Sequence, residues 1–244
     1  MKWADWEATY DTILNDMSLN RELEARALEA AVRASSVTRC LKDDAALAEL
    51  RRRIGHSCIV CGNSPGLEHD MGILLECGAV QDNTIIAADA AGPRIGRIGV
   101  VPDIIVTDMD GETEDEIGQN ARGTLLLLHF HGDNAERASE ISMRLGGPFI
   151  ITVQSMPGKG VFNFGGFTDG DRAVLLAEEF GIRSVVLAGF DFLSPYEQGR
   201  EREIKLRKLR WAKSIMKGAS ERGVTLLSAS ESVSLMETNK KVNV

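Results

Sequence analysis

The spacing of apolar residues divides the chain into two parts. Over residues 1–53, apolar positions recur every three or four residues, which places them on one face of a helix, and glycine and proline are absent. From Ile54 onward glycine appears regularly, and short apolar runs alternate with amphipathic segments. The pattern predicts an N-terminal helical segment, residues 1–53, followed by an α/β domain, residues 54–244.

Three helices are predicted in the N-terminal segment. The first, over about residues 3–17, carries an apolar stripe, which we interpret as a docking surface for another subunit of a homo-oligomer or for the chain's own core. The second is expected over about residues 19–34, where the Asn20 side chain is suited to accept hydrogen bonds from the first N–H groups of the helix. The third is expected over about residues 43–53, since acids begin it and arginines end it.

Seven short apolar runs are predicted to be strands. They comprise residues 57–61, 84–88, 104–107, 124–129, 149–153, 184–188 and 225–227. Several are apolar at nearly every position, which is typical of strands covered on both faces, and most intervals leave room for a crossover helix. The fold class is therefore α/β: Rossmann-like, with a mostly parallel sheet and helices on both faces, preceded by the N-terminal helical segment. A long helix is expected over about residues 197–222.

Composition and charge narrow the classes of function. A hydrophobic fraction of 43% beside a charged fraction of 26% excludes a disordered chain. The net charge of −8 argues against nucleic acid as a partner, because phosphates would be repelled. No apolar run is long enough to span a bilayer, and acids stand where a signal peptide would be apolar, so we expect a cytoplasmic protein without membrane attachment.

The four cysteines include one C-x-x-C pair, Cys58 and Cys61. These two lie in a predicted strand, where residues three apart point to opposite faces and cannot share a metal ion. We therefore expect the cysteines to be small core residues in a reducing compartment.

Acidic residues follow nearly every predicted strand. Asp108 and Asp110 come directly after the third strand, and in an extended chain residues two apart point the same way, about 6.5 Å apart. The others are Asp89, Asp133, Asp169, Asp171 and Asp191. Because parallel strands bring their carboxyl ends to one edge of the sheet, these acids should gather there and require cations. The sequence therefore predicts Mg²⁺ held by carboxylates and bridging to a polyphosphate.

A glycine-rich turn follows the first strand. Gly62, Asn63 and Ser64 open this turn, which leads into a helix, and its free backbone N–H groups are suited to bind phosphate. The sequence is neither G-x-G-x-x-G nor a Walker loop, and residues 156–160 lack the Ser or Thr that must follow the lysine of a P-loop. A P-loop NTPase is therefore excluded.

Some of the acids have a purely structural interpretation. Thr168 and Asp171 have the spacing of a capping box, which accounts for Asp171 without a function in binding. Asp133 is equally suited to be the N-cap of the helix that follows it. The Asp-Gly pair at residues 110–111 is also typical of a simple turn.

The blocks at the strand ends resemble those of a known family. They comprise residues 62–65, 88–90, 102–111, 129–134, 166–172 and 189–192. In order and spacing they are similar to the archaeal 6-hydroxymethyl-7,8-dihydropterin pyrophosphokinases, the MptE-type enzymes, over about residues 57–195. That family is similar in turn to the thiamin pyrophosphokinases.

The resemblance implies a reaction and a set of site residues. ATP would donate a diphosphate to the hydroxymethyl group of a pterin, leaving AMP. The implied metal ligands are Asp89, Asp108, Asp110 and Asp169, of which Asp108, Asp110 and Asp169 are the expected catalytic residues. The expected nucleotide- and phosphate-binding residues are Gly62, Asn63, Ser64, Thr168, Asp171 and Lys159. The expected substrate-binding residues are His131, Asp133, Asn134, Phe167 and Asp191, the last as a partner for the aminopyrimidine edge of the pterin.

Four other functions are compatible with parts of the pattern. The D-x-D-G at residues 108–111 imitates haloacid-dehalogenase-type phosphatases, although those place the nucleophile on the first strand. Glycosyltransferases use D-x-D to hold a metal and a nucleotide sugar, and flagellin-modifying proteins carry a domain similar to this family. A non-catalytic nucleotide-binding module is the third alternative. A thiamin pyrophosphokinase, which the similarity of the two families implies, is the fourth.

Overall fold

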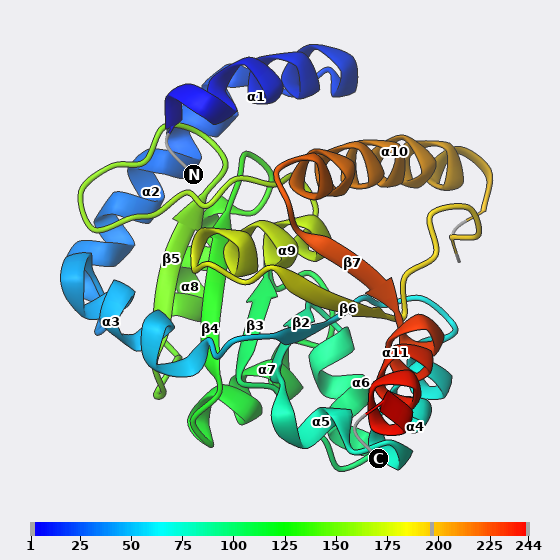
Figure 1. The fold of residues 1–244 in the computed structure, drawn as a ribbon. Coiled ribbons are helices and arrows are strands. Elements are labelled where there is room, and N and C mark those ends of the chain that lie inside the picture. The colour runs from blue at the N-terminus through cyan, green and yellow to red at the C-terminus, as the bar shows by residue number, and fades with distance from the viewer. Residues whose placement is uncertain (1–2, 196–197, 243–244) are drawn as a thin grey trace.

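The computed structural model describes residues 3–195 and 198–242, and its centre is one parallel sheet of seven strands (Figure 1). The order across the sheet is β5-β4-β3-β2-β1-β6-β7. The strands are β1 (Cys58–Cys61), β2 (Thr84–Ala88), β3 (Ile104–Thr107), β4 (Leu125–Phe130), β5 (Phe149–Val153), β6 (Ser184–Ala188) and β7 (Thr225–Ser228). Each of the seven predicted runs forms one of these strands, so the α/β class with a parallel sheet is confirmed.

Both faces of the sheet are buried, which is why its strands are apolar at nearly every position. In β1, Cys58 and Val60 belong to the core on one face, whereas Ile59 and Cys61 belong to the core on the other. The two cysteines of the C-x-x-C therefore point to opposite faces, as predicted. Strands β1 to β5 are buried along their whole length, and β7 at the edge is partly exposed.

Helices cover both faces of the sheet (Figure 1). One face carries α2 (Arg21–Val37), α4 (Leu67–Glu76), α5 (Ala79–Asp82), α6 (Ala91–Arg97), α7 (Thr113–Ala121), α8 (Ala135–Ser142) and α11 (Ala229–Val242). The other carries α1 (Trp3–Met17), α3 (Asp43–Arg53), α9 (Asp169–Glu179) and α10 (Gly199–Glu221). The long helix predicted over residues 197–222 is α10, and its expected first residue lies outside the described residues.

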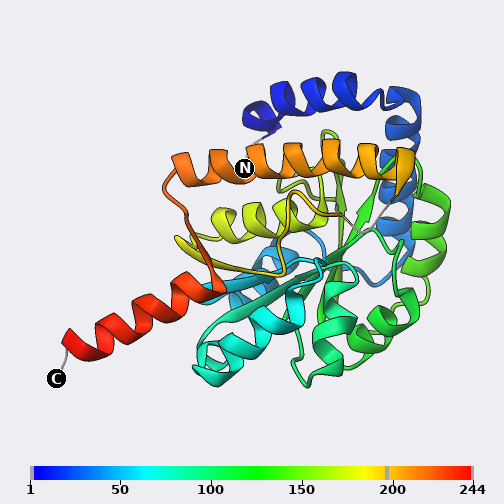
Figure 2. The same ribbon diagram turned by 90° about the vertical axis from the view of Figure 1, so that its right-hand side faces the viewer.

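The N-terminal helices pack onto this α/β core. The Asn20 side chain accepts hydrogen bonds from the N–H groups of the first turn of α2, so the predicted cap is confirmed. The apolar stripe of α1, which includes Trp6 and Tyr10, is buried against the core shared with α9 and α10. Figure 2 shows α1 lying above α10 on the same side of the sheet. The docking surface predicted for α1 thus faces the chain's own core.

The connections between strands place a crevice beside β1. The chain runs from β1 to β5 toward one edge of the sheet and then returns to β6 on the other side of β1. Between β1 and β6 the loops that leave the two strands therefore turn in opposite directions, which opens a site for a ligand at their carboxyl ends. Among the described helices, none combines the length and apolar character that crossing a bilayer requires.

Candidate active site at the carboxyl edge of the sheet

Three carboxylates converge where β2 and β3 end. Asp89 follows β2, and Asp108 and Asp110 follow β3, which pairs with β2. Each of these residues offers one carboxylate oxygen, and the three oxygens all lie within 4.8 Å of one another. Among the described residues this is the one group of three or more acids, histidines or cysteines so arranged. We call Asp89, Asp108 and Asp110 the acidic cluster.

An unusual backbone brings the cluster together. The backbone φ angle is 47° at Asp89 and 61° at Met109. Both values lie in the left-handed region, which residues other than glycine rarely adopt. A Cβ atom on Gly111 would lie 2.9 Å from a carboxylate oxygen of Asp89, so this turn approaches Asp89 more closely than any residue with a side chain would allow. Such strain persists where the surrounding structure enforces it, and it is concentrated at functional sites.

Hydrogen bonds fix the two segments that carry the cluster. The Thr107 hydroxyl lies 3.3 Å from Asp89 Oδ1 and accepts a hydrogen bond of 2.9 Å from the Met109 N–H group. On the side of β4, His131 Nε2 lies 3.2 Å from Asp108 Oδ2. The cluster is therefore held from below by Thr107 and from one side by His131.

The charges of the cluster oppose one another. Burial and the neighbouring carboxylates of Asp108 and Asp89 raise the pKa of Asp110 to about 6. Burial and the charge of Asp108 likewise raise the pKa of Asp89. The pKa of Asp108 is lowered, because its hydrogen bond with His131 and the charge of that side chain outweigh the effect of burial. Because the three close carboxylates repel one another, the site favours a bound cation.

A cavity of about 180 Å³ lies at the crevice between β1 and β6 and reaches the cluster at Asp89. Its walls come from the turn after β1, the first residues of α9, the loop after β6 and one side of α10. Phe190 and Phe192, whose ring centres are 6.0 Å apart, supply flat apolar surface. The cavity therefore combines an aromatic wall with a carboxylate edge, which suits a planar ring joined to an anionic group.

The turn after β1 lines this cavity, but fewer of its N–H groups are free than the sequence suggested. The N–H groups of Gly62 and Ser64 donate to the carbonyl oxygens of Ala188 and Gly189 at the end of β6, at 2.8 and 2.9 Å. The backbone donors expected to bind phosphate are therefore partly used in joining β1 to β6. Arg94 secures the turn by donating to the Asn63 side chain and to the Ser64 carbonyl, and it also pairs with Glu68.

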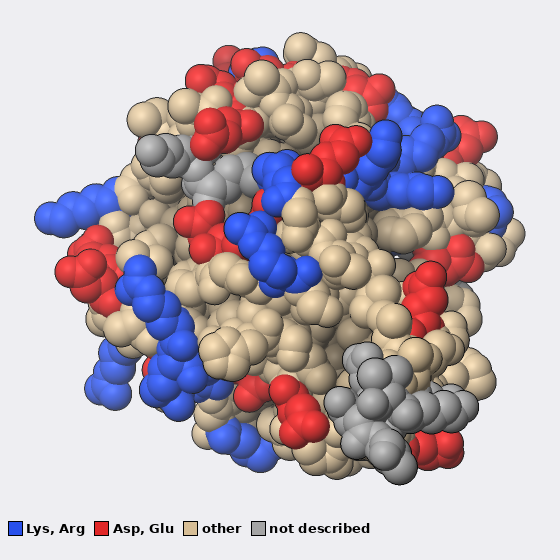
Figure 3. Space-filling model, in the orientation of Figure 1, with Lys and Arg blue, Asp and Glu red and all other residues tan. Residues whose placement is uncertain are grey.

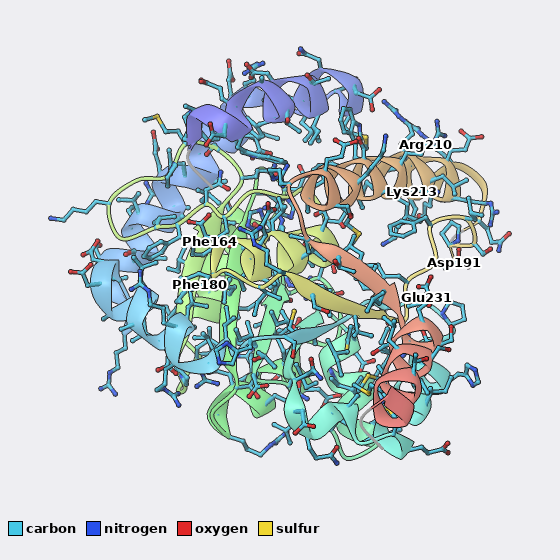
Figure 4. All side chains as sticks on the ribbon, in the orientation of Figure 1. Phe164, Phe180, Asp191, Arg210, Lys213 and Glu231 are labelled. Atoms are coloured by element: carbon cyan, nitrogen blue, oxygen red, sulfur yellow. The ribbon has the colours of Figure 1, made fainter. Side chains whose placement is uncertain are left out.

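Seven of the predicted site residues line the cavity: Gly62, Asn63, Ser64, Asp89, Thr168, Asp169 and Asp191. Asp169 lies beside the acidic cluster without belonging to it, and burial together with the charges of Asp108 and Asp89 raises its pKa well above the usual value. The carboxylate of Asp191 accepts the N–H groups of Leu193 and Ser194, which lower its pKa. In Figure 4, Asp191 lies in the loop below α10, the helix that carries Arg210 and Lys213.

Asp171 and Phe167 are not among the residues that line this cavity. Thr168 and Asp171 form the predicted capping box of α9, and Asp171 Oδ1 accepts the N–H groups of Phe167 and Thr168 at 2.9 and 2.7 Å. The Asp171 side chain is fully buried, and Phe167 packs against the core. The structure thus gives Asp171 the structural role that the sequence offered as an alternative.

Lys159 lies far from the cavity. It follows β5, the edge strand that β4, β3 and β2 separate from β1, a distance of about 19 Å at the usual strand spacing. The neighbouring Gly158 packs closely against Val32 of α2. The Gly160 carbonyl accepts a hydrogen bond from the Ser35 hydroxyl of the same helix, so the segment that carries Lys159 is held against α2, away from the turn after β1.

The loop after β4 lies on the other side of the cluster. Asn134 is buried, and its side-chain amide donates to the backbone carbonyls of Asp108 and His129, so it supports the loop. Asn134, and not Asp133, is the N-cap residue of α8, which corrects the structural interpretation of Asp133. Asp133 is exposed at the tip of this loop.

Two buried acids near the site were not singled out from the sequence. Glu116 on α7 is fully buried and lies 3.1 Å from the Thr107 hydroxyl. Glu24 on α2 is buried as well, and its carboxylate accepts the N–H group of Gly132 at 3.1 Å. The burial of Glu24 could have been predicted from the sequence, because Glu24 continues the spacing of the buried Ala27 and Ala31 on the apolar face of α2.

Basic side chains gather on α10, the helix that forms one wall of the cavity. Figure 3 shows Lys and Arg side chains gathered over α10, in the upper right of the view, although the chain as a whole is acidic. Lys205 on this helix lines the cavity, and its charge lowers the pKa of Asp110 against the larger effects that raise it. A polyanionic ligand would therefore meet positive charge as it approaches the acidic cluster.

Comparison with known proteins identifies a family that matches this architecture. Residues 37–196 match the family described as MptE-like, 6-hydroxymethylpterin diphosphokinase MptE-like. This segment includes β1 to β6 and every residue of the acidic cluster.

Three archaeal proteins named 6-hydroxymethyl-7,8-dihydropterin pyrophosphokinase are similar over most of their length. The protein from Pyrococcus furiosus is 33% identical over 235 residues, which cover 91% of this chain and 96% of the relative. That from Methanocaldococcus jannaschii is 30% identical over 232 residues, 88% of this chain and 95% of the relative. That from Methanothermobacter thermautotrophicus is 38% identical over 194 residues, 78% of this chain and 77% of the relative.

Proposed function

Because this chain belongs to the MptE-like family of 6-hydroxymethylpterin diphosphokinases, we propose that it transfers a diphosphate from ATP to the hydroxymethyl group of 6-hydroxymethyl-7,8-dihydropterin. The single observation that carries this proposal within the site is the acidic cluster of Asp89, Asp108 and Asp110 beside a cavity with an aromatic wall. Family membership supplies the acceptor, and the geometry supplies the means of holding a polyphosphate.

The residues of the cluster fit Mg²⁺. Carboxylate oxygens are the ligands that this hard cation prefers, and three of them from two adjacent strands leave room for water and phosphate oxygens. Bound Mg²⁺ would neutralise the triphosphate and hold it for an in-line displacement. We include Asp169 as a further ligand, direct or through water, because it lines the cavity next to Asp89.

The two substrates are assigned to opposite sides of the cluster. An in-line displacement requires the attacking and leaving groups to lie on opposite sides of the phosphorus. We place the nucleotide in the cavity at the β1–β6 crevice, where Asn63, Phe190 and Asp191 surround it, and the pterin on the side of His131. Asp191 then belongs to the nucleotide side, which revises its expected role as a pterin ligand.

The reaction forms one bond and breaks one. The hydroxymethyl oxygen attacks the β-phosphorus of ATP, and the bond from this phosphorus to the bridging oxygen of the α-phosphate breaks, which releases AMP. The hydroxyl proton needs an acceptor. We assign that role to Asp110, the member of the acidic cluster that is most open to solvent.

Asp110→Ala is the variant that tests this proposal. It should remain folded but lose Mg²⁺-dependent conversion of ATP to AMP in the presence of hydroxymethyldihydropterin. Asp115→Ala is the matched control, because Asp115 is an exposed acid of α7 outside the cluster, and it should retain activity. Normal turnover in Asp110→Ala would remove Asp110 from the site.

The choice of acceptor is tested separately with the unmodified protein. Hydroxymethyldihydropterin, thiamin and a sugar acceptor with its nucleotide sugar would each be offered, and AMP or nucleotide release would be measured. Release of AMP with the pterin alone supports the proposal. Turnover with thiamin or sugar, or binding of ATP without turnover, would assign the chain to one of the alternatives considered for its sequence.

A further inference from the structure

A buried carboxyl group lies directly beneath the acidic cluster. Glu116 on α7 is 0% exposed, and among the described residues its Oε1 atom has no hydrogen-bond partner. Its Oε2 atom lies 3.1 Å from the hydroxyl oxygen of Thr107. A side chain of this kind is costly to bury, and a helix position that only needed to fill the core would carry an apolar residue.

The Thr107 hydroxyl joins Glu116 to both strands of the cluster. It accepts the N–H group of Met109, which belongs to the strained turn between Asp108 and Asp110, and it lies 3.3 Å from Asp89 Oδ1. The hydroxyl has one proton and two carboxyl neighbours, Asp89 and Glu116. If the carboxyl of Glu116 donates a hydrogen bond to Thr107, the hydroxyl proton of Thr107 is directed to Asp89.

The environment of Glu116 favours that arrangement. Burial and the charge of Asp89 raise its pKa to about 9, and no salt bridge to Glu116 is present among the described residues. A neutral Glu116 removes one negative charge from a region that already holds three carboxylates. The hydrogen bonds then run in one direction, from Glu116 through Thr107 to Asp89.

We propose that Glu116 is a positioning residue of the metal site, acting through Thr107 to hold the carboxylate of Asp89 and the turn of Asp108 and Asp110 in the arrangement that binds a divalent cation. The inference rests on the metal site of the proposed function and goes further, because it assigns a role to a residue that touches neither metal nor substrate. It requires at position 116 a side chain that donates a hydrogen bond to Thr107; a negative charge is not needed.

The test compares three variants on α7 by Mn²⁺ binding, measured by titration with the metal alone. Glu116→Gln retains a donor of the same length and should bind Mn²⁺ within about twofold of the unmodified protein. Glu116→Leu fills the same space without a donor and should weaken binding by about tenfold or more, as loss of a residue that orients metal ligands usually does. Asp115→Asn, the exposed neighbour, should change nothing.

A second pair of variants keeps the test decisive if Glu116→Leu does not fold. Thr107→Ser retains the hydroxyl and should bind Mn²⁺, whereas Thr107→Val should lose affinity as Glu116→Leu does. Combining Thr107→Val with Glu116→Leu should add little to either change, because both remove the same connection. Unchanged Mn²⁺ affinity in Glu116→Leu, or equally weakened affinity in Glu116→Gln, would overturn the inference.

The test also separates this inference from the proposed function. Failure of the unmodified protein to bind Mn²⁺ would contradict the metal site itself. If the unmodified protein and Glu116→Leu both bound Mn²⁺ strongly, only the role of Glu116 would be contradicted.

Discussion

Two Asp-x-Asp segments of this chain have the same acidic spacing and opposite structural roles. In Asp108-Met109-Asp110 both carboxylates join Asp89 in the acidic cluster, and the intervening Met109 takes a left-handed conformation. In Asp169-Gly170-Asp171 the segment begins α9, so Asp171 turns back to cap the helix and only Asp169 reaches the cavity. The direction of the backbone, more than the spacing of the acids, decides whether such a pair can hold a metal.

The largest expected effect is a loss of enzymatic activity when the first segment is changed. Asp108→Asn removes a charge from the cluster and should reduce turnover by about a hundredfold or more, because electrostatic stabilisation of the transferred group is lost. The measurement is AMP formation with the pterin acceptor, and Asp115→Asn should behave as the unmodified protein does. The mass of the unmodified protein after reaction should show no aspartyl-phosphate, since in this mechanism Asp108 is not a nucleophile. A phosphorylated aspartate would support the alternative that the protein is a haloacid-dehalogenase-type phosphatase.

The strained turn of the first segment can be tested at Gly111. Gly111→Ala places a Cβ atom 2.9 Å from the Asp89 carboxylate, so it should displace Asp89 or the turn and weaken Mn²⁺ binding by roughly tenfold. Gly72→Ala is the matched control, because a Cβ atom there meets nothing within 4 Å. Equal Mn²⁺ affinity in both variants would show that the close approach of Gly111 to Asp89 is not needed.

The second segment should respond in stability and not in metal binding. Asp171→Ala leaves the N–H groups of Phe167 and Thr168 without their acceptor and should lower the free energy of unfolding by about 1–2 kcal/mol. Urea denaturation measures the loss, and Mn²⁺ titration of the folded variant should give an unchanged affinity. If Asp171→Ala lost affinity for Mn²⁺ but kept its stability, Asp171 would have to be assigned to the binding site.

The smallest expected effect is a dependence of stability on pH. The pKa of Asp110 rises from an ordinary value of 3.8 to about 6 in the folded protein, so the folded state binds this proton more tightly than the unfolded state does. The resulting stability is fully present below pH 3.8 and is lost as the pH rises to about 6. The difference in melting temperature between the metal-free protein and Asp110→Asn should therefore change across this interval, and saturating Mg²⁺ should reverse the loss. A constant difference would show that Asp110 titrates normally.

The sequence predicted the sheet and the cluster for the same physical reason. Fully apolar runs identify buried strands, and polar residues directly after such runs must lie at the carboxyl edge, which led to Asp89, Asp108 and Asp110. The family resemblance is confirmed by the comparisons. The pairing of α1 with its own core was left open by the sequence, because an apolar stripe does not reveal what covers it.

Other features of the site depend on contacts between distant parts of the chain. The N–H groups of Gly62 and Ser64 are already used because β6 lies beside β1, and Lys159 lies away from the cavity because its loop packs against α2. Glu116 was hidden in an acidic stretch of α7, where periodicity alone does not distinguish the one buried acid from its exposed neighbours.

A crystal structure of the protein grown with Mn²⁺ and a non-hydrolysable ATP analogue tests the central assignment most directly. Anomalous scattering should place at least one Mn²⁺ ion among the carboxylates of Asp89, Asp108 and Asp110, with the analogue's phosphates on it and its base in the crevice between β1 and β6. Manganese bound elsewhere, or an analogue whose phosphates lie away from these three carboxylates, would contradict the account.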